Sequence, residues 1–397
     1  MQVTRADDGQ GLPVFSWAVN ADEGAYEQAY NLARLPFAIH HIGLMPDAHQ
    51  GYGMPIGGVL FADRAVVPYA IGVDIGCGVL AVRTDITEDQ LVYGDTLTKV
   101  LNQIEQFIPV GEGRERHIND KAEAAYTLAE GLGGLPDSVA EEWMLRATPQ
   151  LGTLGGGNHF IELQKDPEGV IYVMIHSGSR SLGHNICTYY QKLALSLNEQ
   201  WHSILPHKEL AYLPLGTEEF DKYWSAMEFA LRFAELNREK MLYRVYDALS
   251  MFIDFEGFDL QVDVHHNYAV WENHYNKNGI VHRKGAVRAR EGETVLIPGS
   301  MGTASYIAQG LGNPKSFQPC QHGAGRAVPR GKTHKLWTTD DVKEQVRQAG
   351  VALVSGNWGK AMEEAPLAYK DIEAVMTASS DLIRPITRLL PVGVVKG

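Results

Sequence analysis

Val73-Asp74-Ile75-Gly76-Cys77-Gly78-Val79 places a carboxylate and a thiol three residues apart on a backbone interrupted by glycines. Apolar runs flank this stretch on both sides, at 66–67 and at 79–82. The pattern predicts a buried strand that carries a polar tip into a cavity, where Gly76 and Gly78 allow a tight turn or a close approach to a ligand. Asp and Cys are both metal-ligand types, although a single buried Cys more often only packs. The stretch therefore predicts a metal site only if similar donors lie elsewhere in the chain.

Further donors do occur, each at the end of an expected strand or beside glycines. The full set is Asp74, Cys77, His159, His176 and one of His265 and His266. Five ligands exceed one closed tetrahedral site, so they fit two adjacent cations that share the thiolate, as phosphoryl-transfer sites often do. By softness alone, Cys and His donors favour zinc or cobalt. Each histidine taken singly is better explained as a hydrogen-bonded core residue, but the set together predicts a metal centre.

The composition limits the setting of this site. The chain has 397 residues, a formal net charge of −13 and three cysteines without CxxC spacing. The acidic balance argues against broad, non-specific nucleic-acid affinity, which depends on phosphate neutralisation. Unclustered cysteines in odd number favour a reducing, cytoplasmic location without disulfides. Because there is no run of about 18 apolar residues and the N-terminal segment is polar, we expect no membrane span and no secretory signal.

The expected elements follow from apolar spacing and turn residues. Helices are predicted at 22–34, 97–108, 120–130, 137–147, 217–252 and 337–349. Strands are predicted at 37–44, from 160 onward, at 170–175, at 295–297 and at 390–397. Turn-forming residues predict a loop at 45–58, in which Asp47 and His49 either serve a site or only bond backbone. The polar motifs extend over the whole chain without repeats or linkers, which favours one domain over three.

His322 differs from the other histidines. Gly323 and Gly325 expose backbone N–H groups beside it, and Arg326 offers a bidentate donor to phosphate. A neutral imidazole next to such a nest is a competent nucleophile at phosphorus, which gives a phosphohistidine-type intermediate. The alternative is that His322 is one more metal ligand. A Gly/Ser loop after the strand at 295–297 resembles a phosphate or nucleotide cradle, but it lacks the P-loop pattern.

The short motifs of the chain, taken together and in order, resemble those of a known protein family. They are MPDAHQG at 45–51, GVDIGCG at 72–78, GGNHF at 156–160, HSGSR at 176–180, HHNY at 265–268, RKGA at 283–286, PGSMG at 298–302, HGAGR at 322–326 and VKG at 395–397. Together, from about residue 40 to the end, they resemble the RtcB family of GTP-dependent RNA ligases. The resemblance implies one α+β domain over 1–397, with mixed sheets around a central metal cleft and a mainly helical insertion at 184–252.

The resemblance also implies two Mn(II) ions, in place of the zinc or cobalt that the donors alone favour. Asp74, Cys77 and His159 would bind one ion. Cys77, His176 and His266 would bind the other, with the thiolate bridging. His266 is preferred to His265 because the ligand of the family directly precedes the Asn.

By the same resemblance, His322 would take GMP from GTP, and Lys284 and Arg326 would act in catalysis facing phosphate or RNA. The residues implied to hold the nucleotide are Asn158, Glu162, Asn267, Pro298, Gly299, Ser300, Met301, Ser305, Gly323, Ala324, Gly325, Tyr369 and Lys396.

The implied activity joins RNA 3′-phosphate or 2′,3′-cyclic phosphate ends to 5′-hydroxyl ends, in tRNA splicing or RNA repair. The implied partners are GTP and RNA ends, and an activating protein is a further candidate partner. The sequence departs from the forms of the family at 320–321 and at 328–329, where Pro329 removes a backbone donor near the proposed nucleophile. The alternative is therefore a guanylyltransferase that caps 3′-phosphate ends of RNA or DNA with GMP without sealing them.

Overall fold

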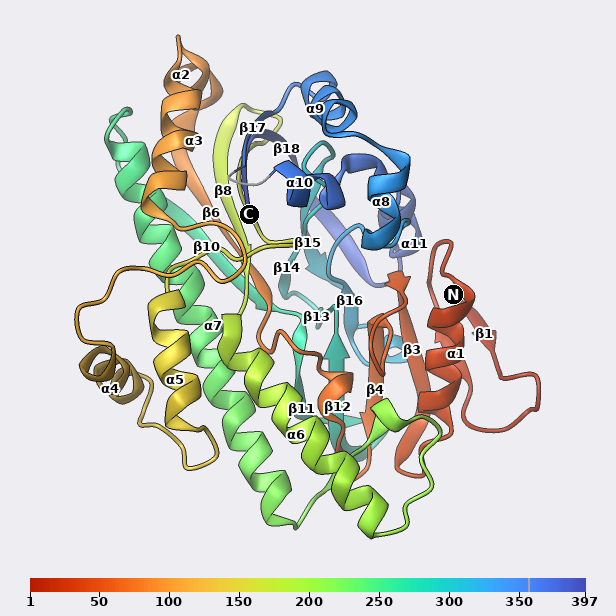
Figure 1. The fold of residues 1–397 in the computed structure, drawn as a ribbon. Coiled ribbons are helices and arrows are strands. Elements are labelled where there is room, and N and C mark those ends of the chain that lie inside the picture. The colour runs from red at the N-terminus through yellow and green to blue at the C-terminus, as the bar shows by residue number, and fades with distance from the viewer. Residues whose placement is uncertain (356–357) are drawn as a thin grey trace.

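The computed structural model describes residues 1–355 and 358–397, and two mixed β-sheets dominate this part of the chain (Figure 1). The smaller sheet has the strand order β1-β2-β3-β4-β12-β11. Its strands are β1 (Gln2–Thr4), β2 (Val14–Ser16), β3 (Ala38–His49), β4 (Ile56–Ala62), β11 (Asn267–His274) and β12 (Lys277–Lys284). Only β2 and β3 run parallel among these neighbours.

The larger sheet has the order β10-β6-β8-β7-β18-β15-β14, and β17 joins it parallel to β18. Its strands are β6 (Gly78–Thr87), β7 (Phe160–Lys165), β8 (Val170–Ser177), β10 (Phe258–His265), β14 (Thr294–Ile297), β15 (Ser305–Gly310), β17 (Ala352–Ser355) and β18 (Ile383–Lys396). Two short pairs are also present: β5 (Ala65–Val66) with β9 (Leu213–Pro214), and β13 (Ala286–Arg288) with β16 (Pro319–Gln321).

The helices pack on both sheets and on one another, and the helix at 23–33 packs on the smaller sheet (Figure 1). They are α1 (Glu23–Ala33), α2 (Glu88–Val92), α3 (Thr96–Phe107), α4 (Lys121–Gly131), α5 (Glu141–Ala147), α6 (Arg180–Gln200), α7 (Glu218–Ser250), α8 (Arg330–Leu336), α9 (Thr339–Gln348), α10 (Trp358–Ala361) and α11 (Ile372–Ala378). Alternate side chains of β6 lie in different cores: Leu80 packs with α3 and α7, whereas Val79 packs with α9. Helices and sheets thus share one α+β fold, which confirms the predicted class.

The register of the larger sheet brings distant motifs to one end of it. Gly78 of β6 pairs with His265 of β10 and with Ser177 of β8. His176 of β8 pairs with Phe160 of β7, which pairs with Lys396 of β18. Because paired residues lie side by side across a sheet, the residues next to these pairs converge without any local sequence signal.

Most predicted elements are confirmed. The helices at 22–34, 97–108, 120–130, 217–252 and 337–349 correspond to α1, α3, α4, α7 and α9, and α5 begins at Glu141, later than predicted. The strand at 390–397 is the end of β18, which begins at Ile383. The helical segment at 184–252 contains most of α6 and all of α7; its status as an insertion within a single domain stays a prediction.

Of the two predictions about the polar stretches, one is wrong and one is confirmed. The loop predicted at 45–58 is strand up to His49, because β3 continues to pair with β4 through an irregular register. The tight turn predicted at Gly76 is present: the strand begins at Gly78, and the residues before it form a turn in which the Cys77 N–H donates to the Asp74 carbonyl, with Gly76 at φ 74°. Among residues 1–355 and 358–397, no helix is long and apolar enough to cross a membrane.

Candidate metal and nucleotide site

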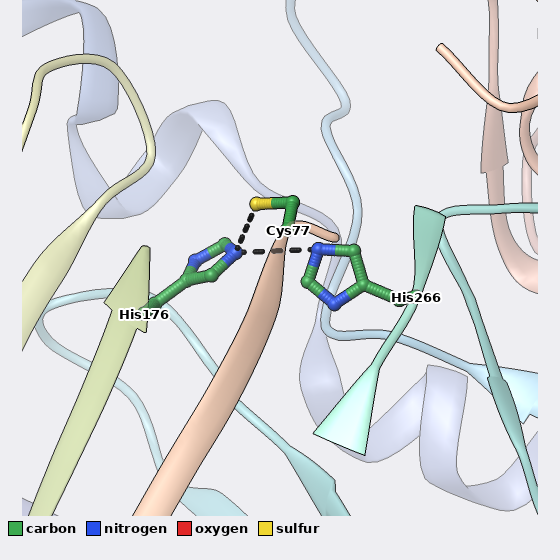
Figure 2. Close-up of side chains that lie close together, drawn as sticks. All are labelled: Cys77, His176 and His266. Atoms are coloured by element: carbon green, nitrogen blue, oxygen red, sulfur yellow. Dashed lines mark hydrogen bonds between the residues drawn. The ribbon is translucent and has the colours of Figure 1, made fainter. Parts of the chain in front are cut away.

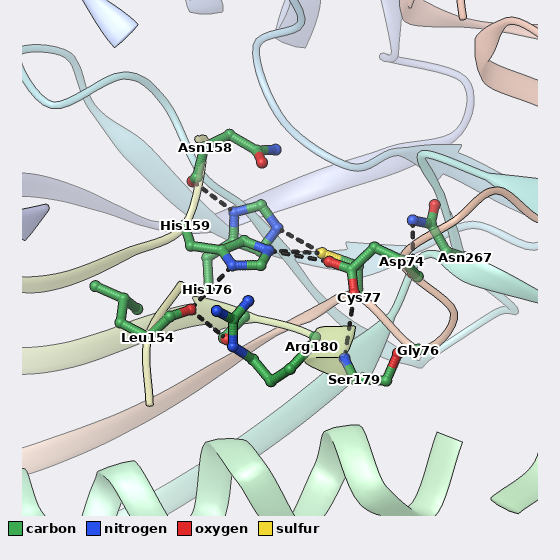
Figure 3. A network of polar contacts seen from close by, with 12 residues as sticks. Asp74, Gly76, Cys77, Leu154, Asn158, His159, His176, Ser179, Arg180 and Asn267 are labelled. Carbon is green, nitrogen blue, oxygen red and sulfur yellow. Dashed lines mark hydrogen bonds and ion pairs between the residues drawn. The ribbon is translucent and has the colours of Figure 1, made fainter. Parts of the chain in front are cut away.

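Two overlapping sets of metal-ligand side chains meet at the end of the larger sheet. One set is Cys77, His176 and His266; the other is Asp74, Cys77 and His159. In the first set, the Nε2 atom of His176 lies 3.3 Å from the Cys77 sulfur and 3.4 Å from the His266 Nε2 atom (Figure 2). In the second, the Nε2 atom of His159 lies 3.0 Å from a carboxylate oxygen of Asp74 and 3.5 Å from the Cys77 sulfur (Figure 3). The thiol therefore lies between the two sets.

Backbone carbonyls define which nitrogen of each imidazole faces the cluster. The Nδ1–H of His159 donates to the Leu154 carbonyl, and the Nδ1–H of His176 donates to the Asn158 carbonyl. With the proton on Nδ1, each Nε2 atom presents a lone pair to the cluster. Burial lowers the pKa of His176 and His266 well below the usual range, which keeps both rings neutral.

This donor set fits cations. The Nε2 lone pair of His159 faces a carboxylate oxygen of Asp74 at 3.0 Å, and the Nδ1 atom of the buried His266 has no hydrogen-bond partner among the described residues, so protein hydrogen bonds alone leave this donor set unsatisfied. Burial, with Asp74 nearby, raises the pKa of the Cys77 thiol well above its usual range, so a bound cation is what would stabilise the thiolate. His265 does not join the cluster, because it accepts a hydrogen bond from Arg238 instead.

His322 lies next to this cluster on a different segment, directly after β16. Its ring centroid is 4.8 Å from that of His266. Both the backbone N–H and the Nδ1–H of His322 donate to one carboxylate oxygen of Asp47, at 3.1 Å and 2.5 Å. Asp47 is completely buried in β3. The Nδ1–H bond leaves the lone pair on Nε2, which is the atom that a nucleophilic imidazole uses.

A cavity of about 670 Å³ joins the cluster and His322. Nearly all residues predicted from the sequence line it: Asp74, Cys77, Asn158, Glu162, His176, His266, Asn267, Lys284, Pro298, Gly299, Ser300, Met301, His322, Gly323, Ala324, Gly325, Arg326, Tyr369 and Lys396. His159 and Ser305 do not line it. The Ser305 hydroxyl oxygen lies behind the wall, where it accepts from the Gly299 N–H at 3.1 Å. Ser305 thus supports the loop at 298–302 and does not face the cavity.

The cationic side chains of Lys284 and Arg326, which are predicted to face phosphate or RNA, already donate hydrogen bonds to protein acceptors. The Lys284 ammonium donates to the carbonyls of Tyr52 and Tyr69, and burial lowers the pKa of Lys284 to about 8. The Arg326 guanidinium donates to Glu364 and to the backbone carbonyls of residues 363 and 328. Both side chains line the cavity; two of the three N–H donors of Lys284 and the fork of Arg326 are engaged by protein acceptors.

Sequence reasoning missed Glu364, a completely buried carboxylate in the cavity wall. It accepts from Arg326, Arg330 and the Tyr369 hydroxyl. Burial raises its pKa, but Lys396 and the two arginines outweigh that effect and hold the pKa at about 2. Glu364 is therefore ionised throughout the physiological range and balances the cations of the wall. Its only sequence signal is an acid near a Pro-containing loop, which is too common to be informative.

Glu162 gives a pH-dependent prediction. Burial raises its pKa to about 7, against the opposing effects of Gln164 and Lys396. A carboxyl whose pKa is raised on folding stabilises the fold while protonated, and this stability is lost as pH rises from the unfolded pKa near 4 through about 7. We expect the free energy of unfolding of the wild type to fall by about 3 kcal/mol over this window relative to Glu162→Gln.

Denaturant unfolding of both proteins at pH 5 and pH 8 measures this difference. Glu168→Gln, which alters a carboxylate at the 166–169 turn between β7 and β8, is the control and should follow the wild type. Parallel pH dependence of the wild type and Glu162→Gln would show that burial does not shift Glu162 as inferred.

The site as a whole has the parts of an enzyme that acts at phosphorus: two cation-ligand sets and an oriented imidazole in one cavity. The family model described as tRNA-splicing ligase RtcB matches residues 28–397. The chain is 38% identical to the RNA-splicing ligase RtcB of Escherichia coli (strain K12), over 98% of each chain. It is 34% identical to the tRNA-splicing ligase RtcB of Methanococcus maripaludis, over 95% of this chain and 92% of that one. The tRNA-splicing ligase RtcB of Thermococcus kodakarensis is 32% identical over 94% and 90%.

The protein belongs to the RtcB family of RNA ligases, which confirms the resemblance drawn from its motifs.

Proposed function

We propose that the protein is a GTP- and Mn(II)-dependent RNA ligase that joins 3′-phosphate or 2′,3′-cyclic phosphate ends to 5′-hydroxyl ends through a GMP–histidine intermediate on His322. The observation that carries the proposal is the Asp47–His322 pair beside the ligand cluster in one cavity. A role in tRNA splicing or RNA repair is the part of the proposal that the names of the relatives support, and a cytoplasmic location and an activating protein partner are further parts of the proposal.

The two ligand sets would each hold one Mn(II) ion, with Cys77 common to both. Bound there, the ions would supply positive charge to the phosphates of the substrates. The nucleotide would lie along the wall formed by the loop at 298–302, Tyr369 and Lys396, which all line the cavity together with His322.

In the first step, the Nε2 lone pair of His322 attacks the α-phosphorus of GTP. A nitrogen–phosphorus bond forms, the bond to the bridging oxygen breaks, and pyrophosphate leaves with the electron pair. The ring keeps its Nδ1 proton and becomes positively charged, and the buried Asp47 carboxylate at 2.5 Å balances that charge. Asp47 thus orients the ring before the attack and stabilises it afterwards.

In the second step, an oxygen of an RNA 3′-phosphate attacks the phosphorus of the GMP–histidine. The nitrogen–phosphorus bond breaks, and its electron pair returns to His322. In the third step, the 5′-hydroxyl oxygen attacks the activated 3′-phosphorus, GMP leaves, and the hydroxyl proton is lost to solvent. A cyclic phosphate end would first be opened by water. Positioning and charge balance supply most of the rate in such in-line displacements.

One assay tests the proposal. The protein is incubated with GTP labelled in the α-phosphate and with RNA strands bearing a 3′-phosphate and a 5′-hydroxyl, with Mn(II) or with chelator. We expect labelled protein, sealed RNA and released GMP with Mn(II), and none of these with chelator. A stable GMP-capped 3′ end without sealed product would instead support the capping guanylyltransferase. Absence of labelled protein with Mn(II) would contradict both activities.

A further inference from the structure

One part of the cavity is not used by the nucleotide or the metal ligands. Its lining comes from the segment 49–56 and from 69–72, on the side of Lys284. Gly285 connects this part to the nucleophile: a Cβ atom there would lie 3.1 Å from the Cε1 atom of His322, and Ile56 lies against the same position. The wall of this space therefore reaches the Cε1 atom of His322, which is bonded to both ring nitrogens.

Tyr52 stands at the rim of this space. The residue is 68% exposed although it lines the cavity. Two other exposed tyrosines use their hydroxyl groups: Tyr126 donates to Glu130 and Tyr243 donates to Glu239. Within residues 1–355 and 358–397, no hydrogen bond engages the Tyr52 hydroxyl. The ring thus offers a free aromatic face.

The backbone that carries Tyr52 is held rigidly by side chains from three distant segments. Gln28 of α1 donates to the Gly51 carbonyl at 2.7 Å and accepts from the Gly51 N–H at 3.0 Å. Glu209, in the 3₁₀ turn Lys208–Leu210, accepts from the Gly53 N–H at 2.6 Å. The Lys284 ammonium donates to the Tyr52 carbonyl itself. Because the backbone is already anchored, stacking of a ligand on the exposed ring costs little backbone conformational entropy.

The charges around this space favour a base over a phosphate. The ammonium of Lys284 is engaged by two carbonyls, and the carboxylate of Asp22 lines the same side of the cavity. Lys284 has only one N–H donor left on this side, and the Asp22 carboxylate would repel a phosphate there. An aromatic face stacks on any nucleobase without needing charge.

We infer that Tyr52 is a positioning residue that stacks on the nucleobase at one of the two RNA ends, and thereby holds that end beside His322. The inference rests on the proposed function, because it assigns the RNA end of that same site. It predicts that the ring, and not the hydroxyl, sets the affinity for RNA.

The test compares Tyr52→Ala, Tyr52→Phe and wild type in the sealing assay with varied RNA concentration. We expect Tyr52→Ala to raise KM for RNA by roughly 5- to 100-fold, the range of one lost base–aromatic stack, with a smaller change in kcat. Tyr52→Phe should stay within about twofold of wild type, because the ring remains. Formation of GMP–protein without RNA should be unchanged in both variants. Tyr93→Ala, which removes an 81% exposed tyrosine outside the cavity, is the matched control.

RNA substrates with an abasic end test the base-stacking role of Tyr52 directly. RNA lacking the base at the end that Tyr52 contacts should be a poor substrate for wild type, and Tyr52→Ala should add little further loss. Full additivity with abasic 3′ and with abasic 5′ ends would overturn the inference. So would an unchanged KM in Tyr52→Ala, an equal defect in Tyr52→Phe, or a parallel loss of GMP labelling.

Failure of the proposed function is separable from failure of this inference. If wild-type protein takes no label from GTP, the ligase proposal fails, yet fluorescence anisotropy with labelled 5′-hydroxyl and 3′-phosphate RNA strands still measures binding. Weaker binding by Tyr52→Ala but not by Tyr52→Phe would support the stacking role in that case, and equal binding by all three proteins would overturn it.

Discussion

A His322→Ala protein is expected to form no GMP–protein bond and to seal no RNA. Among the described histidines that line the cavity, His322 is the only one whose Nδ1–H donates to a buried carboxylate, and the substitution removes it. Because the covalent step has no substitute nucleophile, we expect the rate of protein labelling from α-labelled GTP to fall by at least about 10⁴-fold. The measurement is label retained on the protein after denaturing electrophoresis, with and without Mn(II).

The matched control is His117→Ala, which removes an exposed histidine outside the cavity and should label like wild type. The Mn(II) content of His322→Ala should also remain near wild type, because neither ligand set includes His322. Normal labelling of His322→Ala would refute the assignment of the nucleophile. Loss of bound metal together with labelling would support the alternative that His322 is a metal ligand.

Asp47→Asn is expected to slow the first step without weakening GTP binding. The neutral amide cannot balance the positive charge that His322 acquires, and it can also turn its NH₂ group toward Nδ1 and move the proton to Nε2. We expect the single-turnover rate of labelling at saturating GTP to fall by about 10²- to 10⁴-fold. GTP affinity should change little, because Asp47 lies behind His322 and does not line the cavity.

Asp63→Asn is the control for Asp47→Asn. Asp63 follows β4 in the same sheet and pairs with Lys277 at the surface, so its neutralisation should leave the labelling rate unchanged. A purely structural role for Asp47 would appear as a lower melting temperature with a normal rate per folded molecule. That result would contradict the orienting role inferred here, as would a loss confined to GTP affinity.

These two residues illustrate how far the sequence could be interpreted. His322 could be found in advance, because glycines and an arginine surround it within five residues. Asp47 was placed in a loop with no definite role, since its partner is 275 residues away and local patterns carry no record of such a contact. Lys284 and Arg326 show the converse: their motifs suggest free cations, whereas the tertiary structure gives each a set of backbone or carboxylate acceptors.

The sequence by itself determined the inventory of this protein: the helices of regular apolar spacing, such as α1 and α7, the donor types near Cys77, and the family to which the motifs belong. These features are local, because spacing, capping and turn chemistry act over a few residues. The tertiary structure provides the physical means by which these donors face one another, through the pairing of Gly78 with Ser177 and His265 across the larger sheet. It also decided which charges are free, since burial and distant partners set both the ionisation and the orientation of each side chain.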